Sequence, residues 1–237
     1  LHAARHNEVW RLFAHGEYRM VDSLLFNVGA MVERDDVSGT QLSPRAGVNW
    51  RVADQQSLRV VSSRAVRNQD IYGKYASTGL TFRELSPAFP AGDTTADFFL
   101  AQSTSTLPLP EEINAFEVGY FGYFPALRTD MDVRWFCEKL NKLVSDPANF
   151  FEFEVDNDSW TELRGIEFQV HHSLAPGSWA WASYAYIDND STNIIETKFT
   201  ARHSGSVAVA HRFASRWNAS AAWYVNRYQN RIAGRYW

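Results

Sequence analysis

The chain alternates apolar and other residues along segments that are long for a globular sheet. In one such segment, every second residue is apolar through Leu24, Phe26, Val28, Ala30 and Val32. Successive side chains of a β-strand point to opposite faces, so a period of two predicts a strand with one apolar face. Ten segments follow this pattern, and the predicted strands cover residues 8–18, 22–34, 43–52, 57–67, 112–124, 128–141, 160–172, 178–188, 200–213 and 217–228.

These predicted strands are about 11 residues long, whereas a typical globular strand has about 5–6 residues. A tilted strand needs about 9–11 residues to cross a bilayer. The connections also alternate in length. The short ones are 19–21, 53–56, 125–127, 174–177 and 214–216, and the long ones lie near 35–42, 68–111, 142–159 and 189–199. Outer-membrane barrels have tight turns at one rim and long loops at the other, so the pattern predicts an all-β, antiparallel transmembrane β-barrel.

The composition agrees with a barrel wall and excludes several other classes of protein. The 237 residues include 9 Trp, 10 Tyr and 16 Phe. Trp10, Trp50, Trp160 and Trp217 lie near predicted strand ends, as in an interfacial aromatic girdle. No run approaches the roughly 18 apolar residues of a membrane helix. The net charge of −4 gives no basis for nucleic-acid binding, and the single Cys137 excludes an internal disulfide framework.

The pattern alone leaves two points open. A soluble all-β binding module with half-buried sheets also alternates, although its strands are usually shorter. In the segment 178–188, Trp179 and Trp181 lie on one face, while Tyr184 and Tyr186 lie on the other. The alternation therefore does not decide which face of this strand is the apolar one.

Several segments resemble one family of barrels. Ser-Pro-Arg at 43–45, with the strand that ends in Ser-Arg-Ala-Val-Arg at 63–67, resembles a mid-barrel hairpin of that family. The segment 111–120 and the Arg-Gly-Ile-Glu sequence at 164–167 resemble later strands, and 182–188 resembles the strand that follows. The order and spacing of these motifs are similar to those of the TonB-dependent receptors of Gram-negative bacteria.

The resemblance implies an active-transport receptor of the outer membrane. In this family a barrel of twenty-two strands surrounds an N-terminal plug domain, and the TonB complex acts on the plug to drive uptake of scarce ligands such as ferric siderophores. Residues 1–237 would then be part of a single barrel domain, about strands 11–20, in contact with outer-membrane lipid. The plug is absent from this sequence, and residues 231–237 do not alternate like the family's closing strand, so we expect a fragment.

The polar face of the predicted strands supplies candidate residues of the barrel lumen. They are charged side chains that alternate with apolar ones, namely Arg45, Arg51, Arg59, Glu117, Asp132, Arg134 and Glu167, with Arg11 and Glu138 in the same pattern. Because the plug fills the lumen in the family, the resemblance implies that these residues hold the plug through hydrogen bonds and ion pairs. Direct contact with the transported ligand is the alternative.

The 68–111 loop is the candidate ligand site, since it combines aromatic and basic side chains. These are Tyr72, Tyr75, Phe82, Arg83, Phe89, Phe98 and Phe99. Aromatic rings and guanidinium groups stack on and pair with anionic ligands, and an iron chelate is such a ligand. A loop that packs its aromatic residues against one another is an equal alternative.

No catalytic residue, metal site or cofactor is predicted. His171 and His172 are the only adjacent histidines, and neighbours in a strand point to opposite faces, so they cannot share a metal ion. The acidic segment 188–193 lacks the glycine and closing glutamate of a calcium loop. We therefore predict a receptor that is not an enzyme. The alternatives are another outer-membrane barrel, such as a porin or a ten-stranded barrel enzyme, and the soluble all-β module.

Overall fold

The fold is dominated by one large antiparallel sheet. The computed structural model of the chain describes residues 6–69, 78–84, 86, 94–101, 109–144, 157–192, 197, 200–213 and 217–227. Ten strands of 11 to 17 residues form the sheet, and they are β1 (Val9–Val21), β2 (Leu24–Asp35), β3 (Gly39–Ala53), β4 (Gln56–Arg67), β7 (Glu111–Phe124), β8 (Thr129–Leu143), β9 (Ser159–Ala175), β10 (Ser178–Ser191), β11 (His203–Phe213) and β12 (Trp217–Arg227). The ten predicted strands are thus confirmed.

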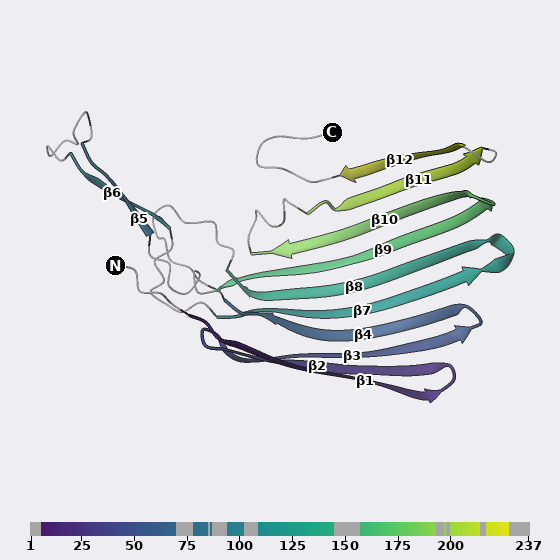
Figure 1. Cartoon of the computed structure of the whole chain (residues 1–237), viewed down its shortest axis with the longest axis horizontal. Coiled ribbons are helices and arrows are strands. Elements are labelled where there is room, and N and C mark those ends of the chain that lie inside the picture. Colours follow the sequence, from purple (N-terminus) through teal and green to yellow (C-terminus); the bar gives the residue numbers. More distant parts are fainter. Residues whose placement is uncertain are drawn as a thin grey trace.

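Each strand of the large sheet pairs with its neighbours along the chain, apart from one insertion. The order is β1-β2-β3-β4-β7-β8-β9-β10-β11-β12, so β1 and β12 are the two edges and the sheet is open. A separate hairpin, β5 (Thr78–Phe82) and β6 (Ala96–Ala101), is inserted between β4 and β7 and was not predicted. In Figure 1 the turns of the large sheet lie at the right, and the small hairpin lies apart at the upper left.

The turn end of the sheet is made of tight connections whose residues suit their backbone. Pro176-Gly177 joins β9 to β10, with Gly177 at a φ of 78°, as a proline–glycine type II turn requires. A single turn of 3-10 helix, Pro125–Leu127, joins β7 to β8 and ends at the left-handed Arg128. None of the helices in the described segments is both long enough and apolar enough to cross a membrane.

At the loop end, one predicted long loop is wrong. Residues 35–42 were expected to form a loop, but β2 continues to Asp35 and β3 begins at Gly39. The buried carboxylate of Asp35 accepts hydrogen bonds from the backbone N–H groups of Val37 and Ser38 at 2.7 and 2.6 Å. This side-chain bonding closes a tight turn that alternation cannot detect, because it depends on one aspartate rather than on a pattern.

One face of the sheet is apolar across its whole width. The register places Leu24 opposite Trp50, and the same row continues through Leu58, Tyr120, Val133, Phe168, Tyr184, Gly205 and Val225. Many side chains on this face are exposed, for example Val28 at 59% and Trp50 at 50% of their surface. An exposed apolar face of this size is unsuited to water and matches the lipid-facing wall of a membrane barrel. Below, it is called the apolar face and the opposite side the polar face.

The register also settles the strand that the sequence left open. Tyr186 pairs with Ile166 and Tyr184 with Phe168, so both tyrosines lie on the apolar face. Trp181 pairs with His171 and lies on the polar face. Position in the sheet, and not the size of the aromatic residues, decides which face of β10 is apolar.

The polar face has a packed centre although most of it is open. Phe136 is only 3% exposed and is the one buried large apolar side chain among the described residues. Its ring lies over Gly165 on the neighbouring strand, where an added Cβ would lie 2.7 Å from Phe136 Cζ and would also strike the carbonyl oxygen of Tyr186. Glycine at 165 is therefore required by the close approach of a ring and a backbone.

We expect Gly165→Ala to destabilise the protein by about 1–3 kcal/mol, the usual cost of overpacking a filled site. Gly119→Ala is the matched control, because the Cβ there would meet only the side chain of Arg59, with Nε at 2.6 Å and Cγ at 2.9 Å, and no backbone atom. That side chain can move at a smaller cost. Denaturant unfolding of the full-length protein in detergent, followed by tryptophan fluorescence, measures both. Equal losses for the two variants would contradict the packing assigned to Phe136.

Candidate functional site

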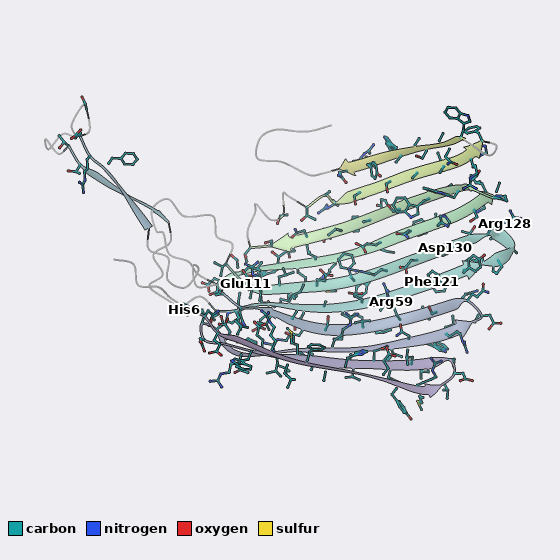
Figure 2. All side chains as sticks on the ribbon, viewed as in Figure 1. His6, Arg59, Glu111, Phe121, Arg128 and Asp130 are labelled. Atoms are coloured by element: carbon teal, nitrogen blue, oxygen red, sulfur yellow. The ribbon has the colours of Figure 1, made fainter. Side chains whose placement is uncertain are left out.

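All seven charged residues predicted to line the lumen lie on the polar face. They come from β3, β4, β7, β8 and β9, and the cross-strand pairs put Arg59, Arg134 and Glu167 in one row and Arg51 and Asp132 in the next. Arg45 and Glu117 lie in rows closer to the loop end. Figure 2 shows Arg59 about midway along the sheet, between the loop end near Glu111 and the turn end near Arg128.

Four of these residues line one hollow on the polar face. Arg59, Asp132, Arg134 and Glu167 line a volume of about 570 Å³. It is also lined by polar residues of β9 to β12, namely Gln169, Ser183, Ser204, Ser206 and Asn226. Arg45, Arg51 and Glu117 do not line it. The hollow therefore presents cations and carboxylates on one side and neutral hydrogen-bonding groups on the other.

Arg134 is the residue on which the contacts of this hollow converge. One guanidinium nitrogen, Nη2, donates a hydrogen bond to Glu138 at 3.2 Å, and Nε lies 3.5 Å from Glu167. The guanidinium carbon lies 4.7 Å from the centroid of the Phe136 ring, a cation–π distance. Two carboxylates and a buried ring thus hold the guanidinium in a fixed position, while its side chain remains 27% exposed. It is placed to bind a further group on the polar face.

Arg59 is positioned by a glycine. Its side chain lies across Gly119 on the adjacent strand, so closely that a Cβ there would lie 2.9 Å from Arg59 Cγ. The two arginines occupy one row, with Gly119 between them. The absence of a side chain at 119 lets Arg59 lie flat against the sheet.

A second candidate region is a hydrogen-bonded network at the loop end, which the sequence did not reveal. Its centre is the neck of the insertion between β4 and β7. The side chain of Gln69 donates to the carbonyl of Leu109 at 3.2 Å, and the backbone N–H of Gln69 donates to Ser38 at 3.1 Å. Asn157, near the end of the β8–β9 connection, donates to the carbonyls of Leu109 at 3.0 Å and Lys142 at 2.7 Å.

These contacts tie three connections together. Gln69 is 8% exposed, and its buried amide marks the neck as a fixed base and not a loose junction. Glu111, two residues after Leu109, is also buried. It pairs with Arg67 at 2.8 Å and accepts a hydrogen bond from the backbone N–H of Val144 at 2.9 Å. Asn157 lies in the predicted long loop 142–159, and no sequence signal marked it as a link between loops.

The predicted ligand residues of the 68–111 loop are only partly within the described structure. Arg83 follows β5 and is exposed, and Phe82 is 48% exposed. Phe98 and Phe99 belong to β6, but their side chains are outside the described residues, as are Tyr72, Tyr75 and Phe89. The structure places Arg83 beside an exposed aromatic residue at the end of a strand.

His171 and His172 have separate partners and form no shared site. The carboxylate of Asp130 lies 3.2 Å from His171 Nδ1, and the Thr129 hydroxyl lies 2.8 Å from His172 Nδ1. Neighbouring residues of a strand point to opposite faces, which agrees with these separate partners. Within the described segments, no group of three or more His, Cys, Asp or Glu residues is arranged to hold a metal ion.

The chain is similar to a known family of proteins and to several solved structures. The family model described as "TonB dependent receptor-like, beta-barrel" matches residues 3–236. Among similar solved structures is the siderophore receptor PirA from Acinetobacter baumannii, with a TM-score of 0.67 and 11% identity over 90% of this chain and 32% of that one. No curated protein matches the chain.

Two further structures share the fold. The FrpB iron transporter from Neisseria meningitidis (F3-3 variant) aligns with a TM-score of 0.63 and 13% identity over 92% of this chain and 32% of its own. The ferripyoverdine receptor of the outer membrane of Pseudomonas aeruginosa, bound to ferripyoverdine, aligns with a TM-score of 0.59 and 14% identity over 88% of this chain and 27% of its own. The chain thus spans about a third or less of the length of these structures.

Proposed function

Because the chain belongs to the TonB-dependent receptor-like β-barrel family, we propose that it forms part of the wall of a receptor that takes up a scarce ligand across the outer membrane. The family consists of receptors and transporters, not enzymes. The ligand proposed is an iron chelate of the ferric siderophore type, and the energy would come through TonB. The chain would supply about strands 11–20 of a twenty-two-stranded barrel in the outer membrane of a Gram-negative bacterium.

The observation that carries the proposal is the separation of two faces over ten strands. One face is apolar across the sheet, and the other collects Arg45, Arg51, Arg59, Glu117 and Asp132 with Arg134 and Glu167. A wall with lipid on one side needs apolar residues there, while a filled polar lumen needs hydrogen-bonding groups on the other. A soluble module would rarely expose so wide an apolar face to water.

The polar face is proposed to hold the plug domain. The hollow around Arg134 offers both signs of charge and several hydroxyl and amide groups. Its ion pairs are partly exposed, with 27% of the Arg134 side chain and 44% of the Glu167 side chain open. Ion pairs as exposed as these stabilise the sheet little by themselves. The presence of these charged residues is better explained by a partner that covers them.

The ligand is proposed to bind the insertion between β4 and β7. The two ends of the insertion are held by Gln69, Leu109 and Asn157, which gives it a firm base at the loop end of the sheet. Arg83 would pair with an anionic chelate, and Tyr72, Tyr75, Phe89, Phe98 and Phe99 would supply the stacking surfaces. Guanidinium and aromatic groups are the side chains that best combine charge pairing with stacking.

Growth and uptake in a deletion strain test the proposal. Cells that lack the full-length gene are supplied with single ferric siderophores as the iron source, and radiolabelled iron uptake is measured with and without a functional TonB. We expect the deletion to abolish uptake of one chelate, and we expect loss of TonB to have the same effect. Uptake that persists without TonB would favour a passive porin, and extraction of the protein without detergent would favour a soluble module.

A further inference from the structure

The polar face divides into a charged wall and a neutral wall. The charged wall consists of β3, β4, β7, β8 and β9, and its charged polar-face residues are Arg45, Arg51, Arg59, Arg67, Glu111, Glu117, Asp130, Asp132, Arg134, Glu138 and Glu167. The neutral wall consists of β10, β11 and β12. Its uncharged polar-face residues are Trp179, Trp181, Ser183, Ala185, Ile187, Asn189 and Ser191 of β10, Ser204, Ser206, Ala208 and Ala210 of β11, and Asn218, Ser220, Ala222, Tyr224 and Asn226 of β12.

The charged residues of these three strands lie outside the middle of the neutral wall. Asp188 and Arg227 lie in rows of the apolar face. Arg212 is the one charged polar-face residue in the parts of β10, β11 and β12 that the structure describes, and it lies at the turn end. Its side chain lies over Gly177, where an added Cβ would be 3.1 Å from Arg212 Cδ, and it donates a hydrogen bond to Asn218 at 3.4 Å. The middle of the neutral wall therefore carries no formal charge.

The neutral wall bonds largely to itself. The hydroxyl oxygens of Ser183 and Ser206 lie 2.7 Å apart across β10 and β11, and Ser206 is only 7% exposed. Ala208 and Ala222, which lie opposite each other on β11 and β12, add only methyl groups. Tyr224 is the exception, because 71% of its surface is exposed. A domain that covers this wall finds few free hydrogen-bonding groups and no charge in its middle.

A plug domain that covers the polar face is therefore held unequally by the two walls. The charged wall can form charge-assisted hydrogen bonds with it, which are roughly twice as strong as those between neutral groups. Separation there also leaves charges without their partners inside the lumen. The neutral wall offers methyl groups and hydroxyls that already bond to one another. A force applied to the plug separates it first from β10, β11 and β12.

The neutral wall also suits the passage of an anionic chelate. Movement through a pore requires contacts that are weak enough to release the solute at each step. Arginines of the charged wall would hold an anion, and its carboxylates would repel one. The rings of Trp181 and Tyr224 can stack on a ligand without either effect. The hollow around Arg134 lies where the two walls meet, since Ser183, Ser204 and Tyr224 also line it.

We infer that the transported ligand crosses the lumen between the plug and the neutral wall, while the plug stays attached to the charged wall. The inference rests on the proposed function, TonB-driven uptake of an anionic iron chelate. It adds the side of the barrel along which the path opens. It also gives the two walls separate tasks, since one anchors the plug and the other guides the ligand.

Thiol labelling in living cells tests the inference. The full-length receptor, with Cys137 and any other cysteine replaced by serine, carries either Ala222→Cys on the neutral wall or Ser57→Cys on the charged wall. Cells take up iron-55 as a hydroxamate or catecholate siderophore complex, whichever restores growth of the deletion strain, in the presence of fluorescein maleimide. We expect functional TonB to raise the labelling rate of Ala222→Cys about tenfold, which corresponds to a change of ~1.4 kcal/mol in the opening equilibrium. The labelling rate of Ser57→Cys should stay the same.

A charge placed in the path provides a second measurement. Ala222→Arg should lower iron-55 uptake about tenfold, equivalent to ~1.4 kcal/mol on the rate-limiting barrier, because the new cation holds the chelate during passage. Ala222→Gln has a similar length without the charge and should retain most of the uptake. Binding of the same chelate to cells without TonB should be unchanged in both variants. The heat-dependent gel migration of each variant shows that its barrel is intact.

The outcomes separate the path from the proposed function. TonB-dependent uptake accompanied by faster labelling of Ser57→Cys, by equal labelling of both cysteines, or by normal uptake in Ala222→Arg would overturn the inference and leave the proposed function in place. Absence of TonB-dependent uptake for every chelate would contradict the proposed function and the inference with it.

Discussion

Arg134→Glu is expected to lower ligand uptake at least about tenfold while the barrel still reaches the membrane. The substitution places a third carboxylate beside Glu138 and Glu167, which lie 3.2 and 3.5 Å from the arginine nitrogens. The existing pairs are partly exposed and contribute little stability on their own. The large effect would arise when the plug covers the hollow, because an unpaired buried charge costs about 3–5 kcal/mol.

Uptake of the labelled iron chelate by intact cells measures this effect, with the amount of folded protein in the membrane determined alongside. Arg134→Gln should cost less, since it removes a charge without adding a repulsive one. The double variant Arg134→Glu with Glu167→Arg restores one opposite pair and should recover part of the uptake. Normal uptake in Arg134→Glu would show that the hollow does not contact the plug, and Arg128→Glu at the turn rim controls for net charge.

Excision of residues 70–108 is expected to weaken ligand binding about 100-fold or more and to leave the barrel folded. The insertion holds all the predicted ligand residues, and the loss of two or three stacking and charge contacts of about 1–2 kcal/mol each accounts for such a factor. The neck makes the excision possible, because the Gln69 side chain and the Leu109 carbonyl are in contact at 3.2 Å. A short Gly-Ser linker can span this distance without strain.

The affinity of the purified full-length protein for the chelate is measured by tryptophan fluorescence quenching. A matched control exchanges only Arg83 for Glu, which removes one charge contact and should weaken binding by a smaller factor. Unchanged affinity after the excision would mean that the aromatic residues pack among themselves and that the ligand binds elsewhere. Loss of the folded barrel would instead show that the neck is needed for folding, and the gel migration of the variant separates these two outcomes.

Alternation predicted the strands and the two faces because both depend on a short-range rule. A side chain two residues away always returns to the same face, so Phe26, Val48 and Trp135 could be placed together before any pairing was known. The same rule placed Arg59 and Arg134 on one face. The strand pairing in the structure further shows that both arginines share a row with Glu167. Such a relation between strands cannot be read from the sequence of any single segment.

Features that depend on one residue or on distant pairs could not be predicted. The turn after β2 is closed by the carboxylate of Asp35, and the neck by the amides of Gln69 and Asn157. Polar residues of these types are usual in solvated loops, so nothing marks the few that are buried.

The open edges of the sheet have a consequence for how such a protein assembles. β1 and β12 each have one neighbour, so each carries a row of backbone amide and carbonyl groups without a partner strand in the described sheet. Hydrocarbon cannot hydrate those groups, and each one left unpaired there costs several kcal/mol. Each edge strand must therefore pair with a further strand before or during insertion. Assembly is then cooperative over the entire wall, and a packing defect at Gly165 would lower the yield of inserted protein instead of loosening one strand.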